Sequence, residues 1–453
     1  MSAGIEHIGK KDVIWSFLAT FFKVGAGMFI LPVILRCMSS ETVALWNVFL
    51  VITSLVLLLD FGFRPSFARN ISYIFSGVRE LQAEGVVHVE ENASIDYSLL
   101  KGTITAMRRF YARLALLVLL LLLLLGTPYF FYILTTKYQG NHVDAIMAWF
   151  LLCAVNCYEL YTYYYDALMT GKGYIKRSQQ IMILSRAAYL MLAMPMVYMG
   201  FGLVSIVLAL TISIILRRFL SYRVFFNPEM KENLRQAQSG DTTKILKAIS
   251  PNAMKVGLTY LGGFLVNKST ILLGTLFLSL EEIAVYGITM QVMDVLTQCA
   301  TIFVQLYTPL IAAARAKSDM AQMKGLYYKS TVALVTIIIF GGFLWILCGD
   351  FALTLIGGQT KFLPTTILTV LLLIQLLEKN HVVASLFIQA DNRIPFYIPS
   401  LLSGMATVIL LWLMLTFTEL RLWAFVLAPG IAQLCYQNWK WPLMVIQELR
   451  QAR

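Results

Sequence analysis

The chain has 453 residues, of which 59% are hydrophobic and 13% charged, and its formal net charge is +12. Soluble domains carry roughly 25% charged residues, so this composition excludes an ordinary soluble enzyme and places the chain in the membrane class. The positive charge needs no nucleic-acid partner to explain it, because the cytoplasmic loops of membrane proteins are themselves rich in Lys and Arg.

The first apolar segment follows a short, polar and basic N-terminus, MSAGIEHIGKKD. It is too long for the core of a signal peptide, and no small-residue cleavage site follows it at RCMSSE. We therefore expect a retained first span.

Twelve segments are apolar over the length of about 20 residues that a helix needs to cross hydrocarbon. They are residues 13–35, 42–66, 111–134, 145–169, 178–199, 201–222, 250–278, 282–310, 328–348, 364–390, 395–416 and 421–446. Their continuous apolar character favours helices, since the strands of membrane barrels alternate over roughly ten residues. The sequence thus predicts an all-α integral membrane protein with about 12 transmembrane helices.

The distribution of Lys and Arg residues tests the division of the chain into spans and loops. If the N-terminus is cytoplasmic, 28 of the 36 are assigned to the inner side, a count that includes several in the inner parts of spans. Four lie outside, namely Arg36, Lys137, Lys361 and Arg421, and four others within spans are counted separately, namely Lys23, Lys255, Lys268 and Lys379. The bias follows the positive-inside rule and predicts that both termini are cytoplasmic.

Polar segments interrupt the pattern at residues 76–110 and 223–249. The second begins with Asn227-Pro228-Glu229, a helix-start signature, and ends at Ser250-Pro251, where a Ser cap and a Pro can open the next span. This segment is predicted to be a cytoplasmic linker. The resulting domains are an N-terminal six-helix lobe (1–222), the linker (223–249) and a C-terminal six-helix lobe (250–453).

The two halves share short matching sequences. SSETVALW at 39–46 and SLEEIAVY at 279–286 lie between the first and second spans of their halves, and the fourth and tenth spans end in LMTGKGYI and FIQADNRI. Tandem six-span repeats are a common way to build a transporter around a central cavity.

Basic residues stand inside several predicted spans. Lys23 and Lys268 lie near the middle of the opening span of each half, and Lys379 is central in the tenth span. Charges at this depth cost several kcal/mol, so they are kept mainly where they pair or line a wet cavity. Lys255 lies nearer the cytoplasmic end and can reach the headgroups by snorkelling.

Acidic residues accompany these bases. Asp60 precedes Arg64 by one helical turn, which indicates a structural ion pair. Glu159 and Asp294 have no basic partner on their own helices, and Glu378 is next to Lys379. Desolvated carboxylates of this kind suit ion coupling, but pairing of Glu159 or Asp294 with Lys23 or Lys268 is an equal alternative.

The fourth span also contains YELYTYYYD at 158–166. Tyr158, Tyr161 and Tyr165 recur at helical spacing, with Glu159, Thr162 and Asp166 on the adjacent face. This surface could stack on sugar rings and bind their hydroxyls, or it could belong to an interfacial aromatic belt.

Motifs of soluble enzymes are absent from the sequence. It has no GxxxxGKS, HExxH or GxSxG, and its six cysteines are scattered without metal-ligand spacing. We expect no enzyme activity, metal or cofactor, and energy from a proton or sodium gradient, the membrane potential or the gradient of the substrate itself.

Two blocks of the chain resemble a known family. GMFILPVILRCMSSETVALWNVF at 27–49, which begins with Gly27, and LLDFGFRPSFAR at 58–69 resemble the N-terminal region of Wzx-type polysaccharide flippases. ILLGTLFLSLEEIAVYGITMQVMD at 271–294, with Pro309 beyond, resembles the start of that family's second half. The family belongs to the superfamily that also holds MATE drug exporters and lipid II flippases.

The resemblance implies two lobes around a cleft that opens alternately to each side. The implied cargo is a lipid-linked oligosaccharide on undecaprenyl pyrophosphate, moved from the cytoplasmic to the periplasmic leaflet of a bacterial inner membrane for O-antigen, lipopolysaccharide or capsule. A polysaccharide polymerase and chain-length proteins are implied partners. Relatives often carry Asp shortly before the ILLG-like run, whereas this chain has Ser269 preceded by Lys268.

The resulting hypothesis is a flippase in which Lys23 and Lys268 grip the pyrophosphate, with Lys379, Arg64, Tyr161 and Tyr165 as further substrate contacts and Glu159, Asp294 and Glu378 as ion-coupling candidates. Ammonium groups form strong charge-assisted bonds with pyrophosphate oxygens. A MATE-like antiporter of organic cations and a membrane polymerase or glycosyltransferase remain the alternatives.

Overall fold

A computed structural model describes residues 15, 22, 27, 29–79, 95–238, 240, 242–316, 319–389 and 395–451. The chain divides into two compact units. Unit 1 consists mainly of Ile52–Gly257, and unit 2 consists of Ile34–Val51 and Leu258–Arg453. Two of the three division points lie within α2 (Ser40–Leu58) and α11 (Thr242–Asn267), and the third lies between Val33 and Ile34 in the helical residues 29–37.

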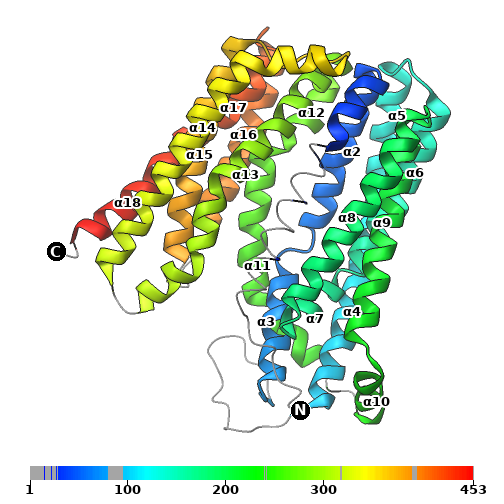
Figure 1. The fold of residues 1–453 in the computed structure, drawn as a ribbon, viewed down its shortest axis with the longest axis vertical. Helices are drawn as coiled ribbons and strands as arrows, with labels where there is room; N and C mark the ends of the chain where they lie inside the picture. Colours follow the sequence, from blue (N-terminus) through cyan, green and yellow to red (C-terminus); the bar gives the residue numbers. More distant parts are fainter. Residues whose placement is uncertain are drawn as a thin grey trace. The chain divides into compact units, whose positions relative to one another are not determined.

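Unit 1 is a bundle of helices (Figure 1). Besides parts of α2 and α11 it contains α3 (Phe63–Phe75), α4 (Tyr97–Leu121), η1 (Leu122–Gly126), α5 (Thr127–Thr136), α6 (His142–Tyr161), α7 (Tyr164–Gly171), α8 (Ile175–Tyr198), α9 (Gly202–Phe225) and α10 (Pro228–Gln236). Helix α9 packs against α6, α7 and α8, and α3 packs against α7. These contacts bring the polar ends of several helices together.

Unit 2 is also helical. It contains the remaining parts of α2 and α11 and α12 (Ser269–Phe277), α13 (Leu280–Ala316), α14 (Met320–Ile356), α15 (Thr365–Gln389), α16 (Tyr397–Phe417), α17 (Leu422–Leu434) and α18 (Gln437–Gln451). Helix α15 packs against α14, α17 and α18, and α16 packs against α12 and α17. Every regular element in the described ranges is a helix, so the predicted all-α membrane fold is confirmed.

Nine helices within the described ranges are long and apolar enough to cross a membrane. They are Ser40–Leu58, Tyr97–Thr136, His142–Gly171, Ile175–Tyr198, Gly202–Phe225, Leu280–Ile302, Met320–Ile356, Thr365–Gln389 and Tyr397–Phe417. The chain is therefore a multi-pass membrane protein. The count of twelve stays a prediction, and most of the expected first span lies outside the described residues. The six-plus-six lobes and the cytoplasmic placement of the termini likewise stay predictions.

Polar caps set several helix boundaries. Asn227 accepts a hydrogen bond from the Met230 amide at 2.8 Å, and Pro228 opens α10, so the predicted helix start is confirmed. Asp96 caps α4, and the helix therefore begins inside the segment expected to be polar. The expected helix start at Ser250 is wrong, because α11 begins at Thr242 and continues through that position.

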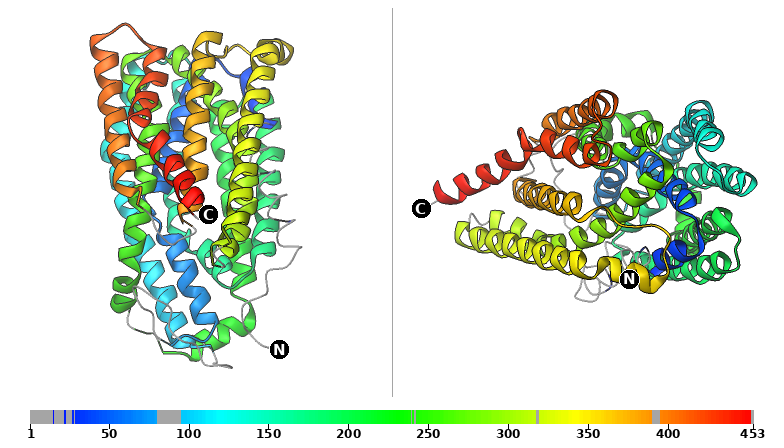
Figure 2. Two further views of the ribbon diagram at one scale, coloured as in Figure 1. Left: turned by 90° about the vertical axis from the view of Figure 1, so that its left-hand side faces the viewer. Right: turned by 90° about the horizontal axis from the view of Figure 1, so that it is seen from above.

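Four expected spans are interrupted. The segments 145–169 and 250–278 break at turns after Tyr161 and Asn267. The segment 421–446 forms two helices, with a turn after Leu434, and α18 takes a different direction from α17 (Figure 2). The segment 42–66 breaks after Leu58 at a turn in which Phe61 and Gly62 have φ of 47° and 72°. Gly257 packs directly on this turn, since a Cβ there would lie 2.7 Å from the Phe61 Cα.

Candidate substrate-binding sites

A cluster of charged side chains lies at the meeting point of α6, α7 and α9 in unit 1. Arg218 on α9 is 1% exposed. Its guanidinium lies 3.0 Å from Asp166 on α7 and 3.8 Å from Glu159 on α6. The neighbouring Arg217 binds the other oxygen of Asp166 at 2.9 Å. Arg217 and Arg218, adjacent residues of α9, thus neutralise acids that lie on α6 and α7.

A second set of residues extends this cluster toward α3 and α4. Tyr111 donates a hydrogen bond to Asp60 at 2.5 Å, and the backbone amide of Arg64 donates to the other Asp60 oxygen at 3.0 Å. The Arg64 guanidinium lies over the ring of Tyr163, 4.6 Å from its centroid. Asp60 and Arg64, expected to form a side-chain ion pair, are therefore joined through the backbone, with a longer-range attraction between their charges.

Positive charge is in excess in this part of unit 1. Arg186 on α8 interacts electrostatically with Glu159 and Arg217, and Arg64 does so with Asp166. We call the following set the arginine cluster: Arg64, Arg186, Arg217, Arg218, Asp60, Glu159 and Asp166. Four guanidinium groups and three carboxylates give it a formal charge of +1 (4 − 3). A cluster of this sign attracts anions.

The tyrosines of the fourth expected span divide between two environments. Tyr161, at the end of α6, is 39% exposed. Tyr165, on α7, packs in an aromatic group with Tyr164 and Tyr222 at centroid distances of 4.4 and 6.2 Å. A turn at residues 162–163 separates the two helices. Both tyrosines therefore contact Tyr164, since the Tyr161 ring lies 6.3 Å from it, but Tyr161 is the more exposed of the two and is open to a ligand.

Lys268 and Asp294 form an ion pair in unit 2. The Lys268 Nζ lies 2.7 Å from the Asp294 carboxylate. Lys268 occupies the turn between α11 and α12, and not the interior of a helix as expected. The two side chains are 30% and 44% exposed, so the pair is accessible. The pairing of Asp294 with a lysine, one of the two alternatives at that position, is what the structure shows, whereas Glu159 pairs with Arg218.

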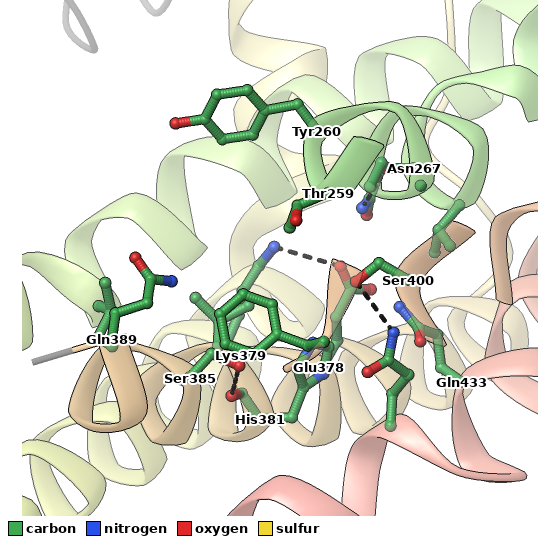
Figure 3. A pocket seen from close by; sticks show the side chains of 17 residues that line it. Thr259, Tyr260, Asn267, Glu378, Lys379, His381, Ser385, Gln389, Ser400 and Gln433 are labelled. Carbon is green, nitrogen blue, oxygen red and sulfur yellow. Dashed lines mark hydrogen bonds and ion pairs between the residues drawn. The ribbon is translucent and has the colours of Figure 1, made fainter. Parts of the chain in front are cut away.

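A cavity of about 280 Å³ lies within unit 2 (Figure 3). It is lined by Thr259, Tyr260, Gly262, Gly263, Val266, Asn267, Glu378, Lys379, His381, Val382, Ser385, Leu386, Gln389, Phe396, Ser400, Gln433 and Gln437. Lys379 lies 3.7 Å from the buried Glu378, and the Gln437 amide donates to Ser400 at 3.2 Å. Hydrogen-bonding groups from four helices, α11, α15, α16 and α17, therefore face one space, together with Gln437 at the start of α18.

The predicted site residues are thus divided among three places. Lys379 and Glu378 line the cavity, Lys268 and Asp294 form the exposed pair, and Arg64 and Glu159 belong to the arginine cluster. Lys23 lies outside the described residues, and the side chain of Lys255 is likewise not described.

Several residues of these sites were not predicted from the sequence. The positive-inside rule assigned Arg217 and Arg218 to topology alone, although two adjacent arginines inside an apolar segment were a usable signal. Tyr111, Gln433 and Gln437 gave no such signal, because uncharged polar residues are common in membrane helices. Their roles depend on helix neighbours that hydropathy does not reveal.

Known proteins resemble the chain in structure but not in sequence. No family model and no curated protein sequence matches it. An inward-facing multidrug resistance MATE family transporter of the MOP superfamily aligns with a TM-score of 0.67 and 14% identity over 96% of this chain and 95% of that chain. An outward-facing structure of such a transporter aligns with a TM-score of 0.56 and 15% identity, over 98% and 96%.

A MOP superfamily transporter from Pyrococcus furiosus Vc1 also aligns, with a TM-score of 0.52 and 13% identity over 98% of this chain and 94% of that chain. Its description states that reverse polarity of its binding pocket suggests a different function. Together these alignments show that the chain has the MATE/MOP fold, as predicted from its sequence.

Proposed function

We propose that the chain is a membrane transporter that moves an anionic, lipid-linked oligosaccharide across the bilayer by alternating access. One observation carries the proposal: each acid that was considered for ion coupling has a basic partner. Glu159 lies near Arg218, Asp294 is paired with Lys268, and Glu378 is paired with Lys379. An exporter of organic cations needs a carboxylate whose charge is available to the cargo.

The net positive charge of the arginine cluster also favours an anionic cargo. Guanidinium groups bind phosphate oxygens through two parallel hydrogen bonds, and they lose less hydration than ammonium groups on doing so. The partly exposed Lys268 adds an ammonium group that can exchange Asp294 for another anion. A pyrophosphate group on a lipid carrier combines the negative charge that these residues favour with a location in the membrane.

The cargo in this proposal is an oligosaccharide repeat unit on undecaprenyl pyrophosphate, moved toward the periplasmic leaflet of a bacterial inner membrane. Such a transporter would supply a polysaccharide polymerase and its chain-length proteins. The fold is also found in multidrug resistance transporters, so an ion-coupled exporter of small molecules is the alternative that the fold favours. The Pyrococcus furiosus protein gives a precedent, in its own description, for linking pocket polarity to function on this fold.

Transport in proteoliposomes tests the proposal. The purified chain is reconstituted with a fluorescent undecaprenyl pyrophosphate-linked saccharide, and a membrane-impermeant quencher reports which leaflet holds the label. We expect protein-dependent movement between leaflets, and none in protein-free vesicles. In a parallel experiment, vesicles contain a cationic dye and carry an imposed proton or sodium gradient.

The outcomes separate the candidate functions. Dye movement without saccharide movement would contradict the proposal and support a MATE-like exporter. Conversion of the labelled saccharide to a longer or shorter product would indicate a polymerase or glycosyltransferase. Retention of the label in its original leaflet under every gradient would also count against a flippase.

A further inference from the structure

The polar part of the cavity lining in unit 2 consists mainly of uncharged hydrogen-bonding groups. Apart from Glu378, Lys379 and His381, its polar lining consists of hydroxyls and amides, contributed by Thr259, Tyr260, Asn267, Ser385, Gln389, Ser400, Gln433 and Gln437. Both kinds of group donate and accept hydrogen bonds. This lining matches a ligand whose own groups do both, as sugar hydroxyls do.

Gln433 supplies the sharpest indication of a ligand. The residue is 5% exposed, and its Oε1 finds no hydrogen-bond partner within the described part of the chain. A buried acceptor without a partner lowers stability, so such atoms are rare unless a ligand or water satisfies them. Gln433 lies on α17 in the wall of the cavity, with Ser400 and Glu378 near it (Figure 3).

Other polar side chains of the cavity are held in place. Asn267 donates to the Gly263 carbonyl at 3.0 Å, Ser385 donates to the His381 carbonyl at 2.9 Å, and Gln437 is bound to Ser400. Side chains fixed before binding lose little freedom when a ligand arrives. The lining is therefore organised without a ligand, which suits recognition of a defined pattern of hydroxyls.

The size of the cavity limits the ligand. Pockets for drug-sized ligands run from about 300 to 1,000 Å³, so a cavity of about 280 Å³ suits one sugar residue better than a whole oligosaccharide. At the rim Tyr260 is 56% exposed, and its aromatic face can contact the C–H groups of a sugar ring.

We infer that this cavity is a binding subsite for one neutral sugar residue, with Gln433 accepting a hydrogen bond from a ring hydroxyl or an acetamido N–H. The inference rests on the proposed function and names the part of the cargo that unit 2 recognises. The phosphate groups of that cargo would be bound elsewhere, by basic side chains.

Binding of free sugars to the full-length protein tests the inference. Saturation-transfer NMR is recorded for glucose, galactose and N-acetylglucosamine, with xylitol as an acyclic polyol control. The detergent must be an amine oxide, because the sugar headgroup of a maltoside would itself compete for the cavity. We expect transfer to at least one cyclic sugar and not to xylitol. Absence of transfer to every cyclic sugar would overturn the inference.

Substitutions locate the binding. Gln433→Leu keeps the approximate shape and removes the acceptor, so it should weaken sugar binding about tenfold. Gln433→Glu should weaken it less, because a buried carboxyl remains protonated and keeps a carbonyl acceptor. Gln375→Leu is the matched control, since Gln375 is buried on α15 but does not line the cavity. Equal binding by Gln433→Leu and the parent would refute the assignment.

A second variant keeps the test valid if Gln433→Leu misfolds. If Gln433→Leu is not monodisperse after purification, Ser400→Ala removes a different hydrogen-bonding group of the same cavity and should also weaken binding. The experiments can refute the proposed flippase function and the sugar subsite independently of each other. Transport of lipid-linked saccharide with unchanged transport in Gln433→Leu would refute only the subsite, whereas sugar binding through Gln433 without such transport would refute only the flippase.

Discussion

Arg218 in the arginine cluster of unit 1 and the Lys268–Asp294 pair of unit 2 differ in how far their charges are buried. Arg218 is almost fully buried between two acids, whereas Lys268 and Asp294 are each about one third or more exposed. A buried guanidinium cannot lose its partners without a large cost, but an exposed ammonium can exchange one anion for another. Arg218 therefore stabilises the packing of unit 1, whereas the Lys268–Asp294 pair remains available to a ligand.

Substitution of Arg218 tests the first half of this comparison. Arg218→Met leaves Asp166 and Glu159 buried without their shared partner, so we expect a loss of about 3–5 kcal/mol in the free energy of unfolding. Thermal unfolding in detergent measures it. Arg217→Met is the matched control and should cost clearly less, because the Arg217 side chain is 22% exposed and contacts one acid. Equal effects would show that burial does not distinguish the two arginines.

A pair of adjacent glycines tests the packing around the cavity. A Cβ at Gly262 would lie 2.3 Å from the Ser400 carbonyl carbon, whereas a Cβ at Gly263 would have no neighbour within 4 Å. Gly262→Ala must push α11 away from α16, and backbone atoms cannot move aside as a side chain can. We expect a loss of about 3 kcal/mol, the upper end for overpacking.

The control for that prediction is Gly263→Ala, in the same helix and on the same cavity. It should be neutral or slightly stabilising, since Ala favours helix over Gly by about 1 kcal/mol. Unfolding temperature and sugar binding are measured for both variants. If Gly263→Ala is the more harmful of the two, the close approach of α11 and α16 is not as the structure has it.

The hydrogen bond from Tyr111 to Asp60 is expected to have the next largest effect. Tyr111→Phe leaves one oxygen of a buried carboxylate without its donor, which should cost about 2 kcal/mol. Tyr164→Phe removes a longer contact, 3.3 Å, to the exposed Arg108 and should cost less. The two variants are compared by thermal unfolding under identical conditions, and a reversed order would show that the Asp60 contact is not a stabilising one.

Hydropathy predicted the class of fold because the bilayer requires long apolar helices. It did not predict the breaks within them. No Gly or Pro marks the turn at Lys268, and the Ser250-Pro251 signature was overridden by a helix that begins at Thr242. A helix interruption of this kind depends on tertiary contacts, which override local preference.

The sequence identified several charged residues of the site but not which residues they pair with. Glu159, Asp294 and Glu378 were recognised as costly charges, yet their partners could not be assigned from spacing, because only Lys379 is near its partner in sequence. Arg218 is far from Glu159 along the chain and meets it only through the packing of α6 against α9. Pairing between helices is information that a single sequence does not display.

Lys268 gives the smallest expected effect on stability and the largest on transport. Because the Lys268–Asp294 pair is partly exposed, Lys268→Gln should change the free energy of unfolding by no more than about 1 kcal/mol. Transport of the lipid-linked saccharide should nevertheless fall several-fold, and Lys268→Arg should retain more of it because positive charge is preserved. Lys361→Gln, at an exposed lysine, is the control for surface charge.

A double variant then distinguishes two reasons for such a loss. If Lys268 serves only to neutralise Asp294, Lys268→Gln combined with Asp294→Asn removes both charges and should restore transport. If the Lys268 ammonium exchanges Asp294 for the cargo, the double variant lacks the group that the pyrophosphate needs, and transport should stay low. Restored transport would therefore show that Lys268 only neutralises Asp294 and does not itself bind the anionic cargo.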